Sequence, residues 1–231
     1  IEDPTKTLDF LDQAAIEQAS VVVALEIAKQ RAVIETERRL QRDFIETLLF
    51  EQHLSENKIV TRAHSLGWDL QGKRVVGVIN LTELRQFHLS RAGSSEEEFH
   101  LAKNHLLQSM AEMMNEQNPG AIVVEQGDFL ILLPNCEKHQ SGASLRRVLQ
   151  PLAEAIYTLI KQVLGECPVL ITFGGFYDSI QGLRNSYDEA KATLRICQNQ
   201  VLHQSITWYD DAALYVLLDR IAEQPDTHQW F

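Results

Sequence analysis

The chain has 231 residues, 45% of them hydrophobic, which is long and apolar enough for one large or two small globular domains. Its formal net charge of -11 argues against a nucleic-acid-binding surface, because such a surface must neutralise phosphates. Cys136, Cys167 and Cys197 are far apart and form no C-x-x-C pair, which predicts free thiols and a cytoplasmic location. No apolar run approaches the roughly 20 residues of a membrane span, so we expect no membrane contact.

Residues 8–50 contain neither glycine nor proline and are rich in strong helix formers. They predict one very long helix, or two nearly continuous ones, spanning about 60 Å at 1.5 Å per residue, longer than a small domain is wide. The stretch 14–28 is apolar on most sides, so another surface must cover it. Burial in the chain's own core and an interface between two copies of the chain are both open. The predicted dimer contacts are Val21, Val22, Leu25 and Val33.

Downstream of this helix, apolar runs alternate between the helical and the strand period. The expected elements are a helix at 55–66, a strand at 73–81, a loop between 81 and 96 that contains Gly93, Ser94 and Ser95, a helix at 96–118, a hairpin at 121–134, a helix at 141–164, a strand at 168–177, a helix at 179–200, an edge strand at 206–208 and a last helix at 211–222. The order β-α-β-β-α-β-α predicts an α+β fold. It is typical of a ferredoxin-like palm, in which helices pack on one face of an antiparallel sheet.

The predicted hairpin carries the most specific turn signal. Gln126, Gly127 and Asp128 lie between the apolar runs AIVV and FLILLP, and glycine supplies the positive φ that a tight turn needs. Phe129 follows Asp128 directly, so the turn offers a single acidic side chain. We expect Asp128 to close the turn through a side-chain hydrogen bond to the backbone rather than to bind a metal ion.

Other short motifs indicate no cofactor chemistry. Gly174 and Gly175 stand at a strand end without the pattern of a phosphate-binding loop, so a bulge or a close backbone approach is expected. His100 and His105 are five residues apart, which does not place them on one helical face as metal ligands. We therefore expect no cofactor and no metal ion.

Three motifs resemble one known family. Gly67-Trp68-Asp69-Leu70 precedes the first strand, Gln126-Gly127-Asp128 forms the hairpin turn, and SYDEAKATLR occupies residues 186–195. By these motifs and their order, residues 40–218 resemble the PucR/CdaR family of bacterial transcriptional regulators. The resemblance implies a GGDEF-like domain, related to diguanylate cyclases but not known as a catalyst, between an N-terminal sensor and a C-terminal helix-turn-helix. Residues 8–35 resemble the last helix of a GAF sensor.

The chain departs from the resembling proteins at two places. Asn80 and Thr82 stand where a resembling cyclase carries aspartates on the first strand, and Glu83 is the nearest acid. Nothing in residues 213–231 matches the family's helix-turn-helix, so DNA binding is expected only through a further module. Because Ile1 is not an initiator methionine, we expect a fragment of a longer protein.

The resulting division is 1–50 as a linker and dimerisation helix, 51–210 as a GGDEF-like regulatory domain and 211–231 as the start of a connector. We expect a non-catalytic, homodimeric part of a PucR/CdaR-like regulator that transmits a signal from an unknown small-molecule effector. The alternative is a nucleotide- or metabolite-binding domain, or one with residual cyclase activity. Within 186–195, core packing with a solvated outer face and docking of another domain are both open; docking would use Tyr187, Glu189 and Arg195.

Overall fold

A computed structural model describes residues 10–51, 55–70, 72–91, 93–136 and 142–222. The chain forms two compact units, residues 1–41 and 42–231, and the predicted long helix, α1 (Phe10–Phe50), contributes to both. In the first unit, the predicted dimer contacts expose half or more of their surface: Val21 67%, Val22 65%, Leu25 70% and Val33 51%. Their pairing with a second chain stays a prediction.

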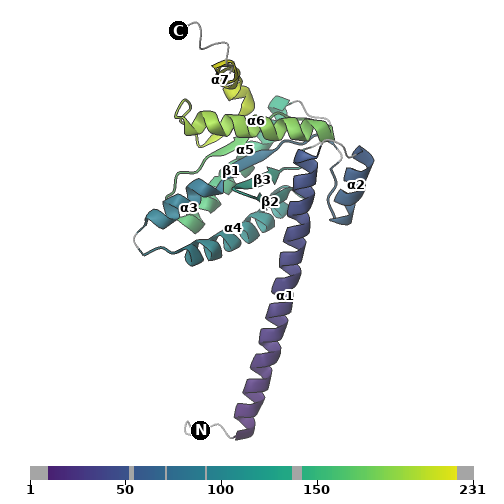
Figure 1. Ribbon diagram of the computed structural model, residues 1–231, viewed down its shortest axis with the longest axis vertical. Coiled ribbons are helices and arrows are strands. Elements are labelled where there is room, and N and C mark those ends of the chain that lie inside the picture. Colours follow the sequence, from purple (N-terminus) through teal and green to yellow (C-terminus); the bar gives the residue numbers. More distant parts are fainter. Residues whose placement is uncertain (1–9, 52–54, 71, 92, 137–141, 223–231) are drawn as a thin grey trace. The chain divides into compact units, whose positions relative to one another are not determined.

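The second unit is built on a five-stranded sheet with the order β2-β3-β1-β4-β5 (Figure 1). Its strands are β1 (Gly77–Asn80), β2 (Ile122–Gln126), β3 (Phe129–Leu133), β4 (Ile171–Phe173) and β5 (Ile206–Trp208). Antiparallel pairs join β2 to β3, β3 to β1 and β1 to β4, so the α+β class and the ferredoxin-like strand order are confirmed. The sheet is nevertheless mixed rather than antiparallel, because β5 returns through a helical crossover and pairs parallel to β4.

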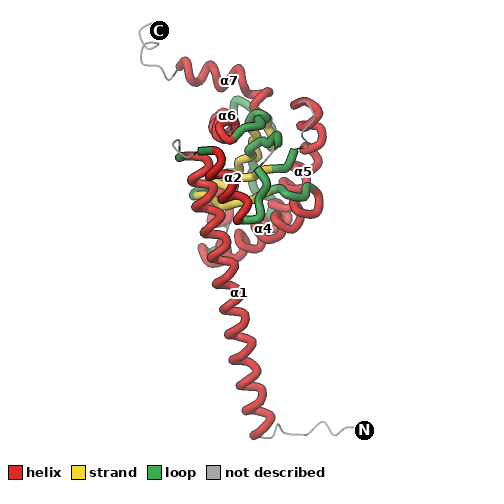
Figure 2. The backbone as a smooth tube through the Cα atoms, turned by 90° about the vertical axis from the view of Figure 1, so that its right-hand side faces the viewer, coloured by secondary structure: helices red, strands yellow, loops and turns green. Residues whose placement is uncertain are grey.

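Helices cover both faces of this sheet, and the expectation of one covered face was wrong. The helices besides α1 are α2 (Glu56–Ser65), α3 (Leu81–Ser90), α4 (Glu96–Gln117), α5 (Gly142–Leu164), α6 (Ile180–Gln198) and α7 (Tyr209–Ala222). Neighbouring strand residues point to opposite faces: Ile79 packs in a core with α3, α4 and α5, whereas Val78 packs in a second core with α6, α2 and the end of α1. Figure 2 shows the strands between α5 and α6. The central strands are apolar on both sides, which requires two covering layers.

The last turns of α1 belong to the core of the second unit. Phe44, Ile45 and Leu48 are 0% exposed, and the Phe44 ring packs edge-on against Trp68 at a centroid distance of 5.5 Å. The predicted division after residue 50 follows the end of the helix, whereas packing joins these turns to the domain that follows. The helix therefore enters the domain as part of its core.

The first strand is shorter than predicted, and an unpredicted helix follows it. The predicted strand covered 73–81, but Leu81 begins α3, in the place of the expected loop. Asn80 explains the change, because its side-chain oxygen accepts hydrogen bonds from the backbone N–H groups of Thr82 at 2.9 Å and Glu83 at 3.4 Å. This N-cap satisfies two of the amides that a helix start leaves without partners.

Gly174 ends β4 and brings α6 close to the sheet, so the predicted strand at 168–177 is cut short. A Cβ atom on Gly174 would lie 1.9 Å from the backbone oxygen of Ser186 in α6. The Ser186 hydroxyl donates to the carbonyl of Gly175 at 2.7 Å and accepts from the N–H of Val76 at 2.9 Å. The expected close backbone approach at this glycine pair is confirmed.

The three cysteines are free, as the sequence predicted, and all three are buried. Burial raises the pKa of the Cys136 thiol to about 11. Among the described residues, none of the helices combines the length and the apolar character that crossing a bilayer requires.

Candidate functional site

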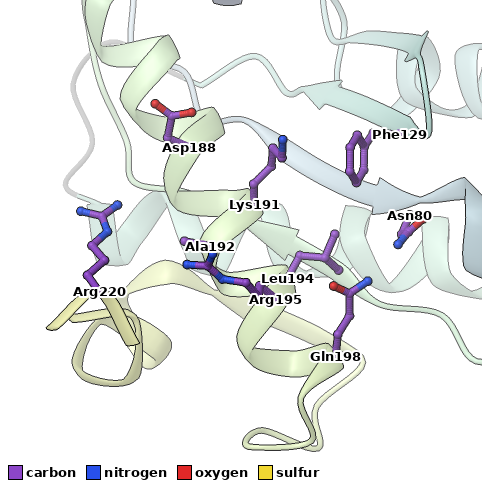
Figure 3. Close-up of a pocket in the computed structure, with 9 residues that line it drawn as sticks. All are labelled: Asn80, Phe129, Asp188, Lys191, Ala192, Leu194, Arg195, Gln198 and Arg220. Carbon is purple, nitrogen blue, oxygen red and sulfur yellow. The ribbon is translucent and has the colours of Figure 1, made fainter. Parts of the chain in front are cut away.

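A pocket of about 360 Å³ lies where β1 ends and β3 begins, beside α6 and α7 (Figure 3). Four elements line it: Asn80 of β1, Phe129 of β3, Asp188, Lys191, Ala192, Leu194, Arg195 and Gln198 of α6, and Arg220 of α7. Its volume falls within the range of about 300 to 1,000 Å³ that small-molecule sites occupy. The fold thus joins the hairpin turn to the helix that carries the 186–195 motif.

Most of the lining comes from α6 because its polar residues recur at helical spacing. The helix begins after Ser179, whose side-chain oxygen accepts a hydrogen bond from the N–H of Gly182 at 3.0 Å. Its inner face is buried in the core shared with the end of α1 and includes Tyr187, Ala190 and Leu194. Its outer face lines the pocket with side chains three or four residues apart, namely Asp188, Lys191, Arg195 and Gln198.

Lys191 rests on two aromatic rings at the pocket wall. Its Nζ atom lies 5.2 Å from the ring centroid of Phe129 and 5.4 Å from that of Tyr187, within the range of a cation–π contact. Phe129 pairs with Gln126 across the hairpin and occupies the position directly after Asp128. Lys191 itself is exposed, so the platform holds a positive charge at the pocket without removing it from solvent.

Two polar contacts connect the outer face of α6 to neighbouring helices. The Nη2 atom of Arg195 lies 2.8 Å from Oδ2 of Asp219 in α7. The side-chain amide of Gln198 donates to Oε1 of Glu83 in α3 at 2.6 Å. These contacts fix α3 and α7 beside the pocket, and Arg220 of α7 completes its lining.

The pocket carries more positive than negative charge. Lys191, Arg195 and Arg220 line it together with one acid, Asp188. The charge of Arg195 is partly balanced by Asp219, which lies outside the lining. In a chain with a net charge of -11, this local excess of positive charge attracts anions. The arrangement suits a carboxylate or phosphate group, which accepts charge-assisted hydrogen bonds from such side chains.

The hairpin turn forms as predicted, but the role of Asp128 differs from the prediction. Gly127 adopts a φ of +57°, and the backbone carbonyl of Asp128 accepts a hydrogen bond from the N–H of Leu81 at 2.8 Å. The Asp128 carboxylate makes no hydrogen bond to the described part of the chain, so the expected side-chain closure of the turn was wrong. The pKa of Arg85 is raised mainly by its hydrogen bond to Glu96, and the negative charge of Asp128 makes the smallest contribution.

The acids near the turn do not form a site for a hard cation. Mg²⁺ needs several oxygen ligands at fixed separation, but Asp128 stands alone in the turn. The side-chain oxygen of Asn80 caps α3, and Glu83 accepts a hydrogen bond from Gln198. Within the described ranges, no group of three or more His, Cys, Asp or Glu side chains is placed to hold a metal ion.

The three residues predicted to dock another domain have different environments. Tyr187 is 3% exposed and packs edge-on against Phe50 of α1 at 5.6 Å, so its assignment to a docking surface was wrong. Glu189 accepts a hydrogen bond from the hydroxyl of Tyr177 at 2.7 Å. Burial, followed by this bond, raises the pKa of Tyr177 to about 12. Arg195 lines the pocket, and a docking role for it and Glu189 stays a prediction.

Sequence reasoning did not single out Lys191, Gln198 or Arg220 as site residues. Lys191 and Arg195 stand at i,i+4, and this spacing was a usable signal for a basic stripe on α6. Arg220 had no such signal, because only the packing of α7 against α6 places it at the pocket.

Residues 51–196 match the family model described as GGDEF-like domain, which is more than half of the chain. The matched segment contains the hairpin and the pocket residues of β1, β3 and α6 up to Arg195, and it ends before Gln198 and α7. The comparison with curated proteins gave no match.

Proposed function

The chain belongs to the GGDEF-like domain family, and from this premise we propose that it is the regulatory, non-catalytic middle part of a bacterial PucR/CdaR-like transcription regulator. One observation carries the proposal. At the end of β1, where a resembling cyclase carries an acid, the side chain of Asn80 is engaged as the N-cap of α3. In our proposal, Asn80 therefore stabilises a helix and does not bind a metal ion.

The hairpin turn supports the same conclusion. Metal-assisted phosphoryl transfer needs several carboxylate oxygens to hold the ions that neutralise the phosphates. The turn supplies Asp128 alone, and the next position carries Phe129, which supports Lys191 through its ring. We therefore expect no turnover of a nucleoside triphosphate at this site.

The entry of α1 into the domain supports a role in signal transmission. The helix runs without interruption from Phe10 to Phe50, and its last turns are buried beneath α6 and α2. A displacement or rotation of these turns would disturb the packing of the domain core, which has few voids to absorb it. In the proposed regulator, two copies pair through α1, and a helix-turn-helix beyond residue 231 contacts DNA at a spacing set by the dimer.

The proposal is tested by incubating the chain with GTP and either Mg²⁺ or Mn²⁺ and measuring cyclic dinucleotide formation. We expect no product, because the acidic ligands of the first strand are replaced. Product formation that disappears in an Asp128→Ala variant would refute the non-catalytic assignment.

The positive pocket supports a second candidate function, the binding of an anionic metabolite or nucleotide. Lys191, Arg195 and Arg220 line a volume of about 360 Å³ with a single acid in its lining. Such a ligand would contact α6 and α7 together, so it would act on the same elements as the proposed signal.

Pyrophosphate is a simple probe for this second candidate in a calorimetric titration. The loss of one charge-assisted contact in Lys191→Gln should weaken binding about tenfold. Lys58→Gln is the matched control, because it removes an exposed lysine of α2 outside the pocket. Equal binding by both variants, or no binding by the unaltered chain, would rule out this anion site.

A further inference from the structure

We propose that α6 is a relay between the end of α1 and α7, with Arg184 as the positioning residue that couples α1 to it. The inference rests on the proposed role in signal transmission and assigns its route inside the domain. Two contacts carry it: one ties the N-terminal part of α6 to the end of α1, and the other ties its C-terminal part to α7.

The first contact is made by Arg184, which is 8% exposed. Its Nε atom donates a hydrogen bond to the carbonyl oxygen of Leu48 at 2.7 Å, and Nη2 donates to the carbonyl oxygen of Glu51. Carbonyl groups in the last turn of a helix have no partner within the helix, and the partial negative charge there attracts a cation. Arg184 therefore binds the end of α1 through both hydrogen bonding and charge.

Packing beside this contact joins the same two helices. The rings of Phe50 in α1 and Tyr187 in α6 meet edge-on at 5.6 Å. Leu48 and Leu183 share the buried core on this face of the sheet. Because interiors are close-packed, the end of α1 cannot shift without a response from α6.

The second contact lies eleven residues further along α6, about 16 Å away at 1.5 Å per residue. There, Arg195 forms an ion pair with Asp219 of α7 at 2.8 Å. Beneath the pair, Ile196 of α6 is buried against Ala212 and Val216 of α7. The position of α7 is thus set by the C-terminal part of α6.

The face of α7 that points away from α6 exposes an apolar surface, whose position depends on that of α7. Four aliphatic side chains at i, i+3, i+4 and i+7 are each at least half exposed: Leu214, Leu217, Leu218 and Ile221. They form one apolar stripe on the helix. If α6 moved, the position of this apolar stripe would change with α7. A downstream element that contacts the stripe could therefore respond to the position of α1.

Hydrogen exchange of the intact chain tests the relay. Arg184→Gln removes the cation from α6, and Arg62→Gln is its matched control. Arg62 belongs to α2 and donates to Thr47 of α1 at 3.2 Å, so it also contacts the end of α1 but not through α6. We expect amide exchange in α7 to rise about threefold or more in Arg184→Gln and to stay unchanged in Arg62→Gln. The amides of β1 and β3 should keep their protection, and Arg184→Lys should give an intermediate result.

Coupling between two sites is reciprocal, which provides a second test at the other end of α6, on the ion pair between the exposed Arg195 and the partly buried Asp219. Asp219→Asn weakens the tie to α7 and should raise amide exchange in the last turn of α1 by a similar factor. If Arg184→Gln does not fold, this arm decides the question.

Unchanged exchange at the remote helix in either folded variant would overturn the relay, and so would a uniform rise throughout the sheet, which marks general destabilisation. The activity assay and the exchange experiment are independent. Cyclic dinucleotide formation would refute the proposed non-catalytic function, whereas the exchange rates alone decide whether α6 is a relay.

Discussion

Replacing Val22 by glutamate should separate a dimer that pairs through α1. Val22 is 65% exposed in the single chain, so pairing would bury about two thirds of its side chain. Full burial of an aliphatic side chain contributes about 1.5 to 3 kcal/mol, which gives about 1 to 2 kcal/mol per chain and about 2 to 4 kcal/mol per symmetric dimer. At about 1.4 kcal/mol per tenfold, the dissociation constant should rise about 30- to 700-fold, before the cost of burying a carboxylate is added.

The assay is light scattering or sedimentation equilibrium across a concentration series. Ser20→Glu is the control, because it adds the same charge to an exposed position about 160° around the helix from Val22. The unaltered chain and the control should be dimers where Val22→Glu is a monomer, with equal helicity in all three. A chain that is monomeric at every concentration, or a dimer that Val22→Glu leaves intact, would refute pairing through this surface.

Two further predictions concern the stability of the second unit. Gly174→Ala should lower the free energy of unfolding by about 1 to 3 kcal/mol, since the new Cβ would lie 1.9 Å from the backbone oxygen of Ser186; an unchanged urea midpoint would contradict the tight contact. The pKa of Tyr177 is raised from 10.0 to about 12, first by burial and then by Glu189, so the folded state holds this proton more tightly than the unfolded state. Its stabilising contribution should be complete below pH 10 and be lost as the pH rises towards 12, and Tyr177→Phe should remove this part of the pH dependence; an identical dependence in both proteins would contradict it.

The sequence predicted the features of the fold that depend on local periodicity and turn chemistry. The long helix lacks glycine and proline, and Gly127 sets the turn of the hairpin, so both could be located without tertiary information. The helix α3 was missed because it is only ten residues long and directly follows an apolar strand. Asparagine is a favoured N-cap residue, so Asn80 was a usable signal for a helix start. From the sequence, Asn80 was interpreted only as the replacement of a cyclase aspartate.

The second covering layer was missed for a different reason. Strands β1 and β3 are apolar at successive positions, and such runs indicate burial on both faces. The ferredoxin-like pattern accounted for one of these layers. The other is built from α6, α2 and the end of α1, and the contact between Arg184 and Leu48 spans 136 residues. A contact at this separation leaves no periodic trace in the sequence.

The candidate site was only partly predictable for the same reason. The outer face of α6 was expected from helical spacing, and the hairpin turn from its glycine. Their meeting at one pocket depends on the strand order, which brings Phe129 beside Lys191, and on α7, which adds Arg220. The periodicity of the sequence predicts neither the contact between Phe129 and Lys191 nor the position of Arg220.

The structural uses of two positions give a physical reason why a domain of this fold can serve regulation. Carboxylates gathered at one site repel each other and raise each other's pKa unless a cation holds them, so a metal site lowers the stability of the empty protein. Here the amide of Asn80 caps a helix and the ring of Phe129 supports a cation, and both contacts stabilise the folded chain without a ligand. The contacts at both ends of α6 also form without a ligand: a buried arginine binds the last turn of α1, and an ion pair holds α7. A domain that must transmit the position of one helix to another needs those connections to be firm at all times, whereas a catalytic site needs its geometry only when substrate is bound.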